Sequence, residues 1–163
     1  MSAEVTAQKI VSMKELENGL EIAIKEITTT MLSCESELIP LSLVEKHPPG
    51  LSAVVGFGGK ISGFVAVHLS LHSACGLASS LIGMEFLEMD DMVADAMGEI
   101  VNMLAGGLKR SVSKDEDLFK ISVPSIVYGD EYATHTPKSA EQVCLGILAG
   151  GYSFSVQLVY ASR

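Results

Sequence analysis

The two halves of this 163-residue sequence show the same order of expected elements. In each half a long amphipathic helix precedes a strand and then two strands that turn at a Gly-Gly pair, Gly58-Gly59 in the first half and Gly150-Gly151 in the second. A Gly-Gly pair between two apolar runs is typical of a β-hairpin. The order returns after about 80 to 90 residues, which is too long for a solenoid unit. The sequence therefore predicts a single domain over residues 1–163, made of a repeat at approximately 12–83 and 90–163.

Both long helices carry clear start signals. The first, expected over 12–32, opens with Ser12 and Glu15 at capping-box spacing. The second, expected over 90–110, begins with Asp90 and Asp91 and ends with Lys109-Arg110, a charge order that suits the helix dipole. We expect an α/β (α+β) fold of two pseudo-twofold halves, with a mixed or antiparallel sheet and the two long helices packed side by side on one face.

The remaining elements follow from apolar runs and turn residues. The uncharged run 61–84 is long enough to cross a bilayer. Its first part alternates with period two and it contains His68 and His72, so we interpret it as a strand followed by a short helix. The expected strands are 38–44, 51–57, 60–70, 118–128, 143–148 and 152–160, with a turn over 47–50 and the short helix over 72–82.

The outer face of the second helix is unusual. Stepped at about 100° per residue, the apolar residues fall on one buried arc: Val93, Ala96, Met97, Ile100, Met103, Leu104 and Leu108. The opposite side carries Asp91, Asp95, Glu99, Asn102, Gly106 and Lys109, with Ala94, Gly98 and Ala105 beside them. Each helical glycine costs about 1 kcal/mol relative to alanine, so either a close approach of another surface or an ordinary solvated face with tolerated glycines explains the pattern.

The segment Glu99-Ile100-Val101-Asn102-Met103, followed by Ala105-Gly106, resembles the E-x-x-N active helix of the CheC/CheX/FliY family of chemotaxis phosphatases, and most of all CheX. The Gly-Gly turn in VVGFGGKISGFVAVHLS, the run ISVPSIVYGDEY and the paired C-terminal strands are similar to the same family. The resemblance implies an aspartyl-phosphate phosphatase for a phosphorylated CheY-like receiver domain.

The resemblance also implies the roles of individual residues. Asn102 is expected to orient the attacking water and Glu99 to dock onto the receiver lysine, which makes these two the candidate catalytic residues. The candidate receiver-docking residues are Asp95, Gly98, Gly106 and Lys109. No cofactor or metal is expected in this chain, and Mg²⁺ is expected on the receiver.

The first helix holds a second copy of the spacing, at Glu15 and Asn18. Because it lies one turn from the helix start and lacks the apolar residue after the asparagine, it is a candidate for a degenerate second site.

Composition excludes several other functions. A net charge of −9 argues against binding to nucleic acid or to an anionic membrane surface. Three scattered cysteines and no signal-peptide pattern indicate a reducing, cytoplasmic setting. His68 and His72 lack the third ligand that a zinc site needs.

Three alternatives to turnover stay open: a non-catalytic binding module for phosphorylated receivers, a motor-switch adaptor, and a purely structural dimer. The resemblance implies a homodimer formed at a sheet edge. The C-terminal strand 152–160 is the predicted edge, because its alternating apolar residues and unpaired backbone invite another strand. Alternatively, this strand lies inside the sheet and the strand near Leu38 supplies the edge.

Overall fold

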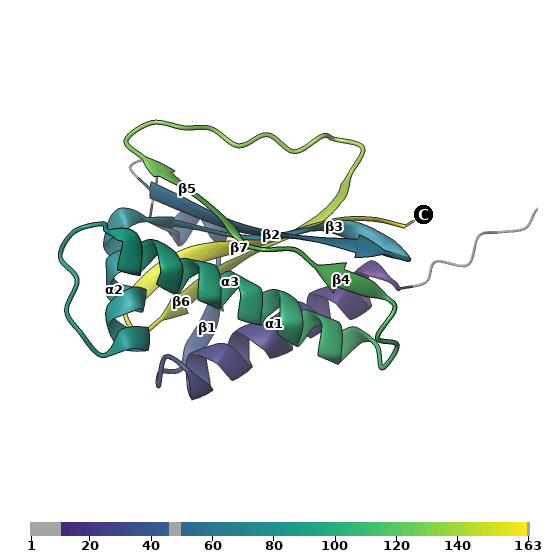
Figure 1. Ribbon diagram of the computed structural model, residues 1–163, viewed down its shortest axis with the longest axis horizontal. Helices are drawn as coiled ribbons and strands as arrows, with labels where there is room; N and C mark the ends of the chain where they lie inside the picture. The colour runs from purple at the N-terminus through teal and green to yellow at the C-terminus, as the bar shows by residue number, and fades with distance from the viewer. Residues whose placement is uncertain (1–10, 46–49, 163) are drawn as a thin grey trace, which may run out of the picture.

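The computed structural model describes residues 11–45 and 50–162, and its helices and strands form two layers (Figure 1). The expected turn over 47–50 and the N-terminal residues without a signal-peptide pattern lie largely outside this range. The helices are α1 (Met13–Thr30), α2 (Leu71–Ile82), α3 (Asp91–Val112) and a short 3₁₀ helix η1 (Leu41–Leu43). The strands are β1 (Ser36–Ile39), β2 (Gly50–Gly59), β3 (Ile61–Ser70), β4 (Phe119–Ile121), β5 (Ser125–Gly129), β6 (Glu141–Ala149) and β7 (Tyr152–Ser162).

The strands form one antiparallel sheet in the order β1-β6-β7-β3-β2-β4, and β5 also pairs with β2. The hairpin between β6 and β7 turns at Gly150 and Gly151, whose φ angles of 58° and 84° favour glycine. The first strand of each half pairs with the hairpin of the other half: β1 with β6, and β4 and β5 with β2. This strand order is compatible with the internal repeat, which stays a prediction.

The predicted edge position of the C-terminal strand is wrong. Strand β7 lies between β6 and β3, and its register with β3 runs from Ser155 opposite His68 to Ser162 opposite Ile61. The alternative that the sequence left open is confirmed, since β1 occupies one edge of the sheet. Alternation of apolar residues indicates which face of a strand is buried, and an edge strand and a central strand can show the same alternation. Strand order instead depends on pairing between segments that are distant in the sequence.

The strand predicted over 118–128 is two short strands. Residues 122–124 interrupt it, where Pro124 has no backbone N–H to donate to a ladder. Ser122 compensates partly: its backbone nitrogen donates to the carbonyl of Gly56 at 2.8 Å, and its hydroxyl accepts from the nitrogen of Gly56 at 3.0 Å. The break carries Pro124 towards α3.

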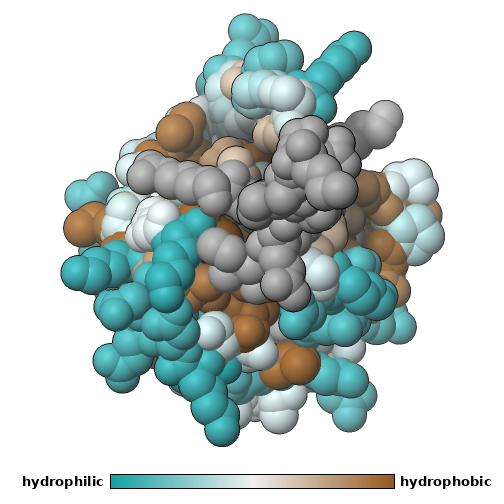
Figure 2. All heavy atoms as spheres, turned by 90° about the vertical axis from the view of Figure 1, so that its right-hand side faces the viewer, coloured by the Kyte–Doolittle hydropathy of each residue, from teal (hydrophilic) through white to brown (hydrophobic). Residues whose placement is uncertain are grey.

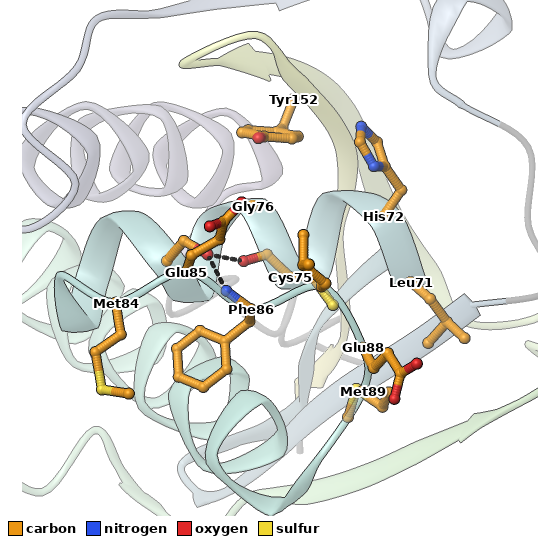
Figure 3. A pocket seen from close by; sticks show the side chains of 12 residues that line it. Leu71, His72, Cys75, Gly76, Met84, Glu85, Phe86, Glu88, Met89 and Tyr152 are labelled. Carbon is orange, nitrogen blue, oxygen red and sulfur yellow. Dashed lines mark hydrogen bonds between the residues drawn. The ribbon is translucent and has the colours of Figure 1, made fainter.

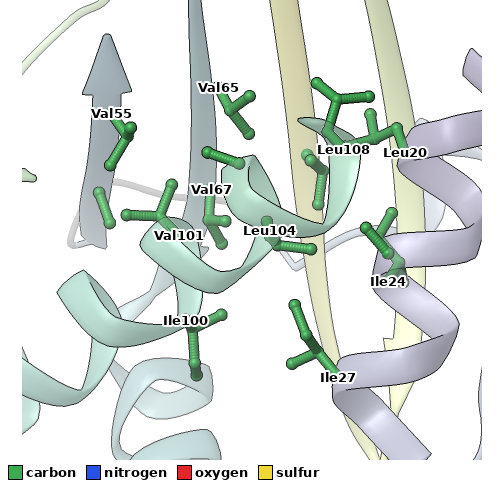
Figure 4. Packing of buried hydrophobic residues seen from close by; sticks show 14 of the residues in the cluster. Leu20, Ile24, Ile27, Val55, Val65, Val67, Ile100, Val101, Leu104 and Leu108 are labelled. Atoms are coloured by element: carbon green, nitrogen blue, oxygen red, sulfur yellow. The ribbon is translucent and has the colours of Figure 1, made fainter. Parts of the chain in front are cut away.

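The two long helices pack side by side on one face of the sheet, as predicted (Figure 1). They run antiparallel, since Gly19 of α1 lies against Val112 of α3, and Ala23 lies against Gly107 one turn further along. Their facing sides and the strands beneath share one apolar core (Figure 4), which includes Leu20, Ile24, Ile27, Val55, Val65, Val67, Ile100, Val101, Leu104 and Leu108.

The uncharged run 61–84 forms β3 and α2, as predicted. In the described part of the chain, no helix combines the length and the apolar character that crossing a membrane requires.

Candidate functional site

Helix α3 presents Glu99 and Asn102 on its outer face. Asp90 caps the helix by accepting from the backbone nitrogen of Val93 at 2.9 Å, which fixes where the helix begins. Buried side chains on the inner face then set its rotation, so that Asp95, Glu99 and Asn102 are all exposed. Among the described residues, none donates to, accepts from or forms an ion pair with these three side chains. A carboxylate and an amide, three residues apart, are therefore available to a partner.

The three glycines of α3 lie in three different environments. Gly107 packs against α1, where an added Cβ would lie 2.9 Å from the Cβ of Ala23. Gly98 is buried, and an added Cβ would lie 3.5 Å from Cγ of Pro124. At Gly106 the nearest atom would be the Arg110 guanidinium at 3.6 Å, so this position is open.

The expectation that Gly98 lies on the exposed face is therefore wrong. The break between β4 and β5 brings Pro124 over this position, a long-range contact that helical periodicity cannot reveal. Gly106 fits a close approach of another surface, and the docking role of either glycine stays a prediction.

The C-terminal end of α3 borders a hollow of about 720 Å³. Lys109 lies half-buried there with its Nζ 5.8 Å from the ring centroid of Phe119, and Arg110 lies 3.8 Å from the carboxylate of Glu26 on α1. The hollow carries charges of both signs, since its lining combines basic and acidic side chains: Gly106, Lys109, Arg110, Ser113, Lys114, Asp115, Glu116, Asp117 and Lys120.

The first copy of the motif has a structural task. The Glu15 carboxylate accepts from the backbone nitrogen of Ser12 at 2.7 Å, and the Ser12 hydroxyl accepts from that of Glu15 at 3.2 Å, which completes a capping box. The backbone N–H of Ser12, and then its hydroxyl, lower the pKa of Glu15. Asn18 is exposed, while the neighbouring Gly19 is buried against Val112. A capped carboxylate is less free to bind a partner than Glu99.

The described residues contain no group of three or more His, Cys, Asp or Glu side chains placed to hold a metal ion. His68 contacts other partners: its Nδ1 lies 2.7 Å from the hydroxyl of Ser52, and its Nε2 lies 2.9 Å from Oε1 of Gln157. The outer face of α3 exposes an anion at Glu99 and an amide at Asn102.

Sequence reasoning missed a polar network on the face of the sheet opposite the helices. The hydroxyl of Tyr132 lies 3.1 Å from that of Ser52, and Nε2 of Gln157 donates to the hydroxyl of Thr136 at 3.0 Å. These contacts fasten the β5–β6 loop over the sheet (Figure 1). The period-two placement of Ser52, His68 and Gln157 in their strands was the signal available in the sequence.

A second hollow, of about 730 Å³, lies between α2 and the segment that leads to α3 (Figure 3). Its loop is held by the Ser79 hydroxyl, which accepts from the backbone nitrogen of Phe86 at 3.0 Å. Burial raises the pKa of the Cys75 thiol at this hollow, which keeps the thiol protonated.

The sequence profile of the family described as Chemotaxis phosphatase CheX matches residues 51–148. A curated relative from Thermotoga maritima, named CheY-P phosphatase CheX, is 31% identical over 83 residues, which make up 50% of this chain and 54% of the relative. The match therefore spans about half the relative's length.

Solved structures share the fold. Chemotaxis protein CheX from Vibrio vulnificus has a TM-score of 0.77 at 18% identity, over 90% of this chain and 97% of that one. A chain of the CheX-CheY-BeF3-Mg+2 complex from Borrelia burgdorferi has a TM-score of 0.70 at 22% identity, over 94% and 100%. These likenesses confirm the predicted fold class.

Proposed function

Because this chain belongs to the family of the chemotaxis phosphatase CheX, we propose that it hydrolyses the aspartyl phosphate of a phosphorylated CheY-like receiver domain. The observation that carries the proposal is the exposed pair Glu99 and Asn102, whose side chains have no partner among the described residues. The name of the Thermotoga maritima relative and the complex from Borrelia burgdorferi support the choice of a CheY-like receiver.

The proposed reaction is attack of water on the phosphorus of the acyl phosphate. The bond between phosphorus and the aspartate oxygen breaks, which releases inorganic phosphate and returns the aspartate carboxylate. The Asn102 amide accepts a hydrogen bond from the water and can donate one, and it does not titrate, so it holds the water in line at any pH. Mg²⁺ on the receiver neutralises charge on the phosphoryl oxygens.

Glu99 has a separate task. A carboxylate three residues before the amide lies on the same side of the helix, and an ion pair between it and the receiver lysine sets the docking register. The other candidate docking residues are Asp95, Gly98, Gly106 and Lys109. Of these, exposed Asp95 and open Gly106 best fit a direct contact, whereas Pro124 covers Gly98.

Phosphate release from a phosphorylated receiver, with and without the chain, tests the proposal. Acceleration is expected with the wild-type chain and with Asn18→Ala, which changes the asparagine of the capped first motif. A chain that binds the phosphorylated receiver without accelerating release is a non-catalytic binding module or an adaptor, and that result contradicts the phosphatase.

We also propose that two copies of the chain associate through the β1 edge. Three apolar side chains are exposed at this edge and just after it: Leu38, Leu41 and Leu43, at 54%, 50% and 66%. An exposed apolar edge strand favours pairing with another strand. Sedimentation is expected to give a dimer that Leu38→Lys separates, and a wild-type chain sedimenting at 17.3 kDa contradicts the proposal.

A further inference from the structure

The outer face of α3 carries an exposed apolar side chain ahead of Glu99 and Asn102. Met92 is 45% exposed, and along α3, whose residues are all described, no other large apolar side chain is exposed. Residues seven apart lie on one side of a helix, so Met92 shares its side with Glu99, about 10 Å further along the axis. A partner that covers Asn102 reaches Met92 if it extends about 15 Å toward the start of the helix.

Two more apolar side chains are exposed in the segment that leads from α2 to α3: Met84 at 53% and Leu87 at 83%. This segment is held on both sides of Leu87, because the backbone of Phe86 is bonded to Ser79 of α2 and Asp90 caps α3. Side chains on a fixed backbone lose less conformational freedom when a partner binds. We call this group the apolar end; it consists of Met84, Leu87 and Met92.

The opposite end of α3 offers a different surface. Beyond Asn102, the helix exposes Arg110 and Ser111, and the hollow beside them carries charges of both signs. Figure 2 looks onto the end of the molecule at which α3 closes and shows many hydrophilic side chains there. The centres of protein interfaces are enriched in apolar side chains, methionine among them, and depleted of charge. The start of α3 therefore fits an interface centre better than its close.

The charged residues next to the apolar end in the sequence have one sign. Residues 61–108 contain no lysine or arginine, whereas 85–99 contain these carboxylates: Glu85, Glu88, Asp90, Asp91, Asp95 and Glu99. Within the described part of the chain, none of them forms an ion pair. The partner surface that complements this region is apolar, with basic groups at its border.

We propose that the receiver docks over the start of α3, with an apolar surface on the apolar end while its phosphorylated aspartate reaches Asn102. An interface of ordinary size covers about 800 Å² on each partner, a patch roughly 30 Å across. The span from Met92 to Asn102 is about half of that, so one receiver covers both. This inference rests on the proposed function and adds to it the direction of docking and the chemistry of the receiver surface.

Two variants, Met92→Ser and Leu87→Ser, remove the apolar groups one at a time. Each is expected to raise the Kd for a CheY-like receiver loaded with BeF₃⁻ and Mg²⁺ by about tenfold, the effect of burying one such side chain. The rise persists at high salt, because salt screens charges and not apolar contacts. With a phosphorylated receiver, KM rises with Kd and kcat is retained. Both positions are exposed, so the melting temperature stays near that of the wild type.

The matched control is Ile22→Ser, at a 57% exposed position on α1 beside the second half of α3, where the adjacent Ala23 lies against Gly107. It is expected to keep the wild-type Kd. An unchanged Kd in either variant of the apolar end, or an equal rise in Ile22→Ser, overturns the inference. Calorimetry measures Kd without turnover, so a chain that binds the loaded receiver without accelerating phosphate release contradicts the phosphatase alone. A wild-type chain that does not bind contradicts both proposals.

Discussion

Gly106 and Gly107 are adjacent in the sequence, yet their replacement by alanine should have opposite effects on stability. Alanine is favoured over glycine in a helix interior by about 1 kcal/mol. At Gly106 the added Cβ meets nothing nearer than the Arg110 guanidinium at 3.6 Å, an ordinary contact. Gly106→Ala should therefore raise the free energy of unfolding by about 1 kcal/mol, which raises the melting temperature by roughly 2–4 °C for a chain of this size.

At Gly107 the same gain is opposed by a clash. The new Cβ would lie 2.9 Å from the Cβ of Ala23 and 3.4 Å from its Cα, so the two helices must move apart. Overpacking of this kind costs about 1–3 kcal/mol, which leaves a net loss of about 0–2 kcal/mol for Gly107→Ala. Thermal and urea unfolding of both variants measure the difference. Equal stabilisation by both would refute the close contact between α1 and α3.

Gly106 also provides a test of docking. Gly106→Leu places a branched side chain one turn beyond Asn102, where it blocks a receiver approaching α3. Activity should fall while the melting temperature stays at or above that of the wild type, because leucine favours the helix. Full activity would show that the open position is not part of the docking surface.

The remaining predictions concern the capping box, the sheet and an exposed ion pair. Glu15→Ala should lower the melting temperature and leave phosphate release unchanged. Glu99→Ala should instead weaken receiver binding at unchanged stability. The reverse pattern would contradict both the capping role of Glu15 and the docking role of Glu99. Val156→Pro should unfold the chain, because β7 is central and proline removes a ladder hydrogen bond; a folded variant would contradict that position. Lys60 lowers the pKa of Asp115. The ionised Asp115 carboxylate therefore stabilises the fold above the pKa that Asp115 has in the unfolded chain, and this stabilisation is lost as the pH falls through the pKa of Asp115 in the folded chain. Asp115→Asn should thus lower the melting temperature at neutral pH, and the difference should shrink as the pH falls below about 4 and vanish below the folded pKa. A difference that persists below the folded pKa would exclude this pair as its source.

Local patterns predicted the elements of this fold well. Asp90, the apolar arc of α3 and the paired basic residues at its end predicted a helix within two residues of the observed one. The Gly-Gly pairs predicted both hairpins, and Ser12 with Glu15 predicted the capping box. The first hairpin, however, turns at Lys60, because Gly58 and Gly59 end β2 and pair with β4. These signals operate within a few residues along the chain, where propensity and capping decide the structure.

Long-range pairing was less predictable. The sequence left open whether the C-terminal strand is an edge, because alternation does not reveal strand order. The exposed position expected for Gly98 was wrong, since Pro124, distant in sequence, covers it. The exposure of Glu99 and Asn102 was predictable from periodicity, but their chemical roles rest on family resemblance and stay predictions.

The most direct test of the proposed phosphatase mechanism is the rate at which a phosphorylated receiver loses its phosphoryl group in the presence of saturating Asn102→Ala. Binding of the same variant to a receiver loaded with BeF₃⁻ and Mg²⁺ is measured beside it. Binding is expected to stay near that of the wild type and the rate to fall to that of the receiver alone, because the exposed amide orients the water and does not stabilise the fold. A variant that binds and still accelerates the reaction at the wild-type rate would contradict the mechanism.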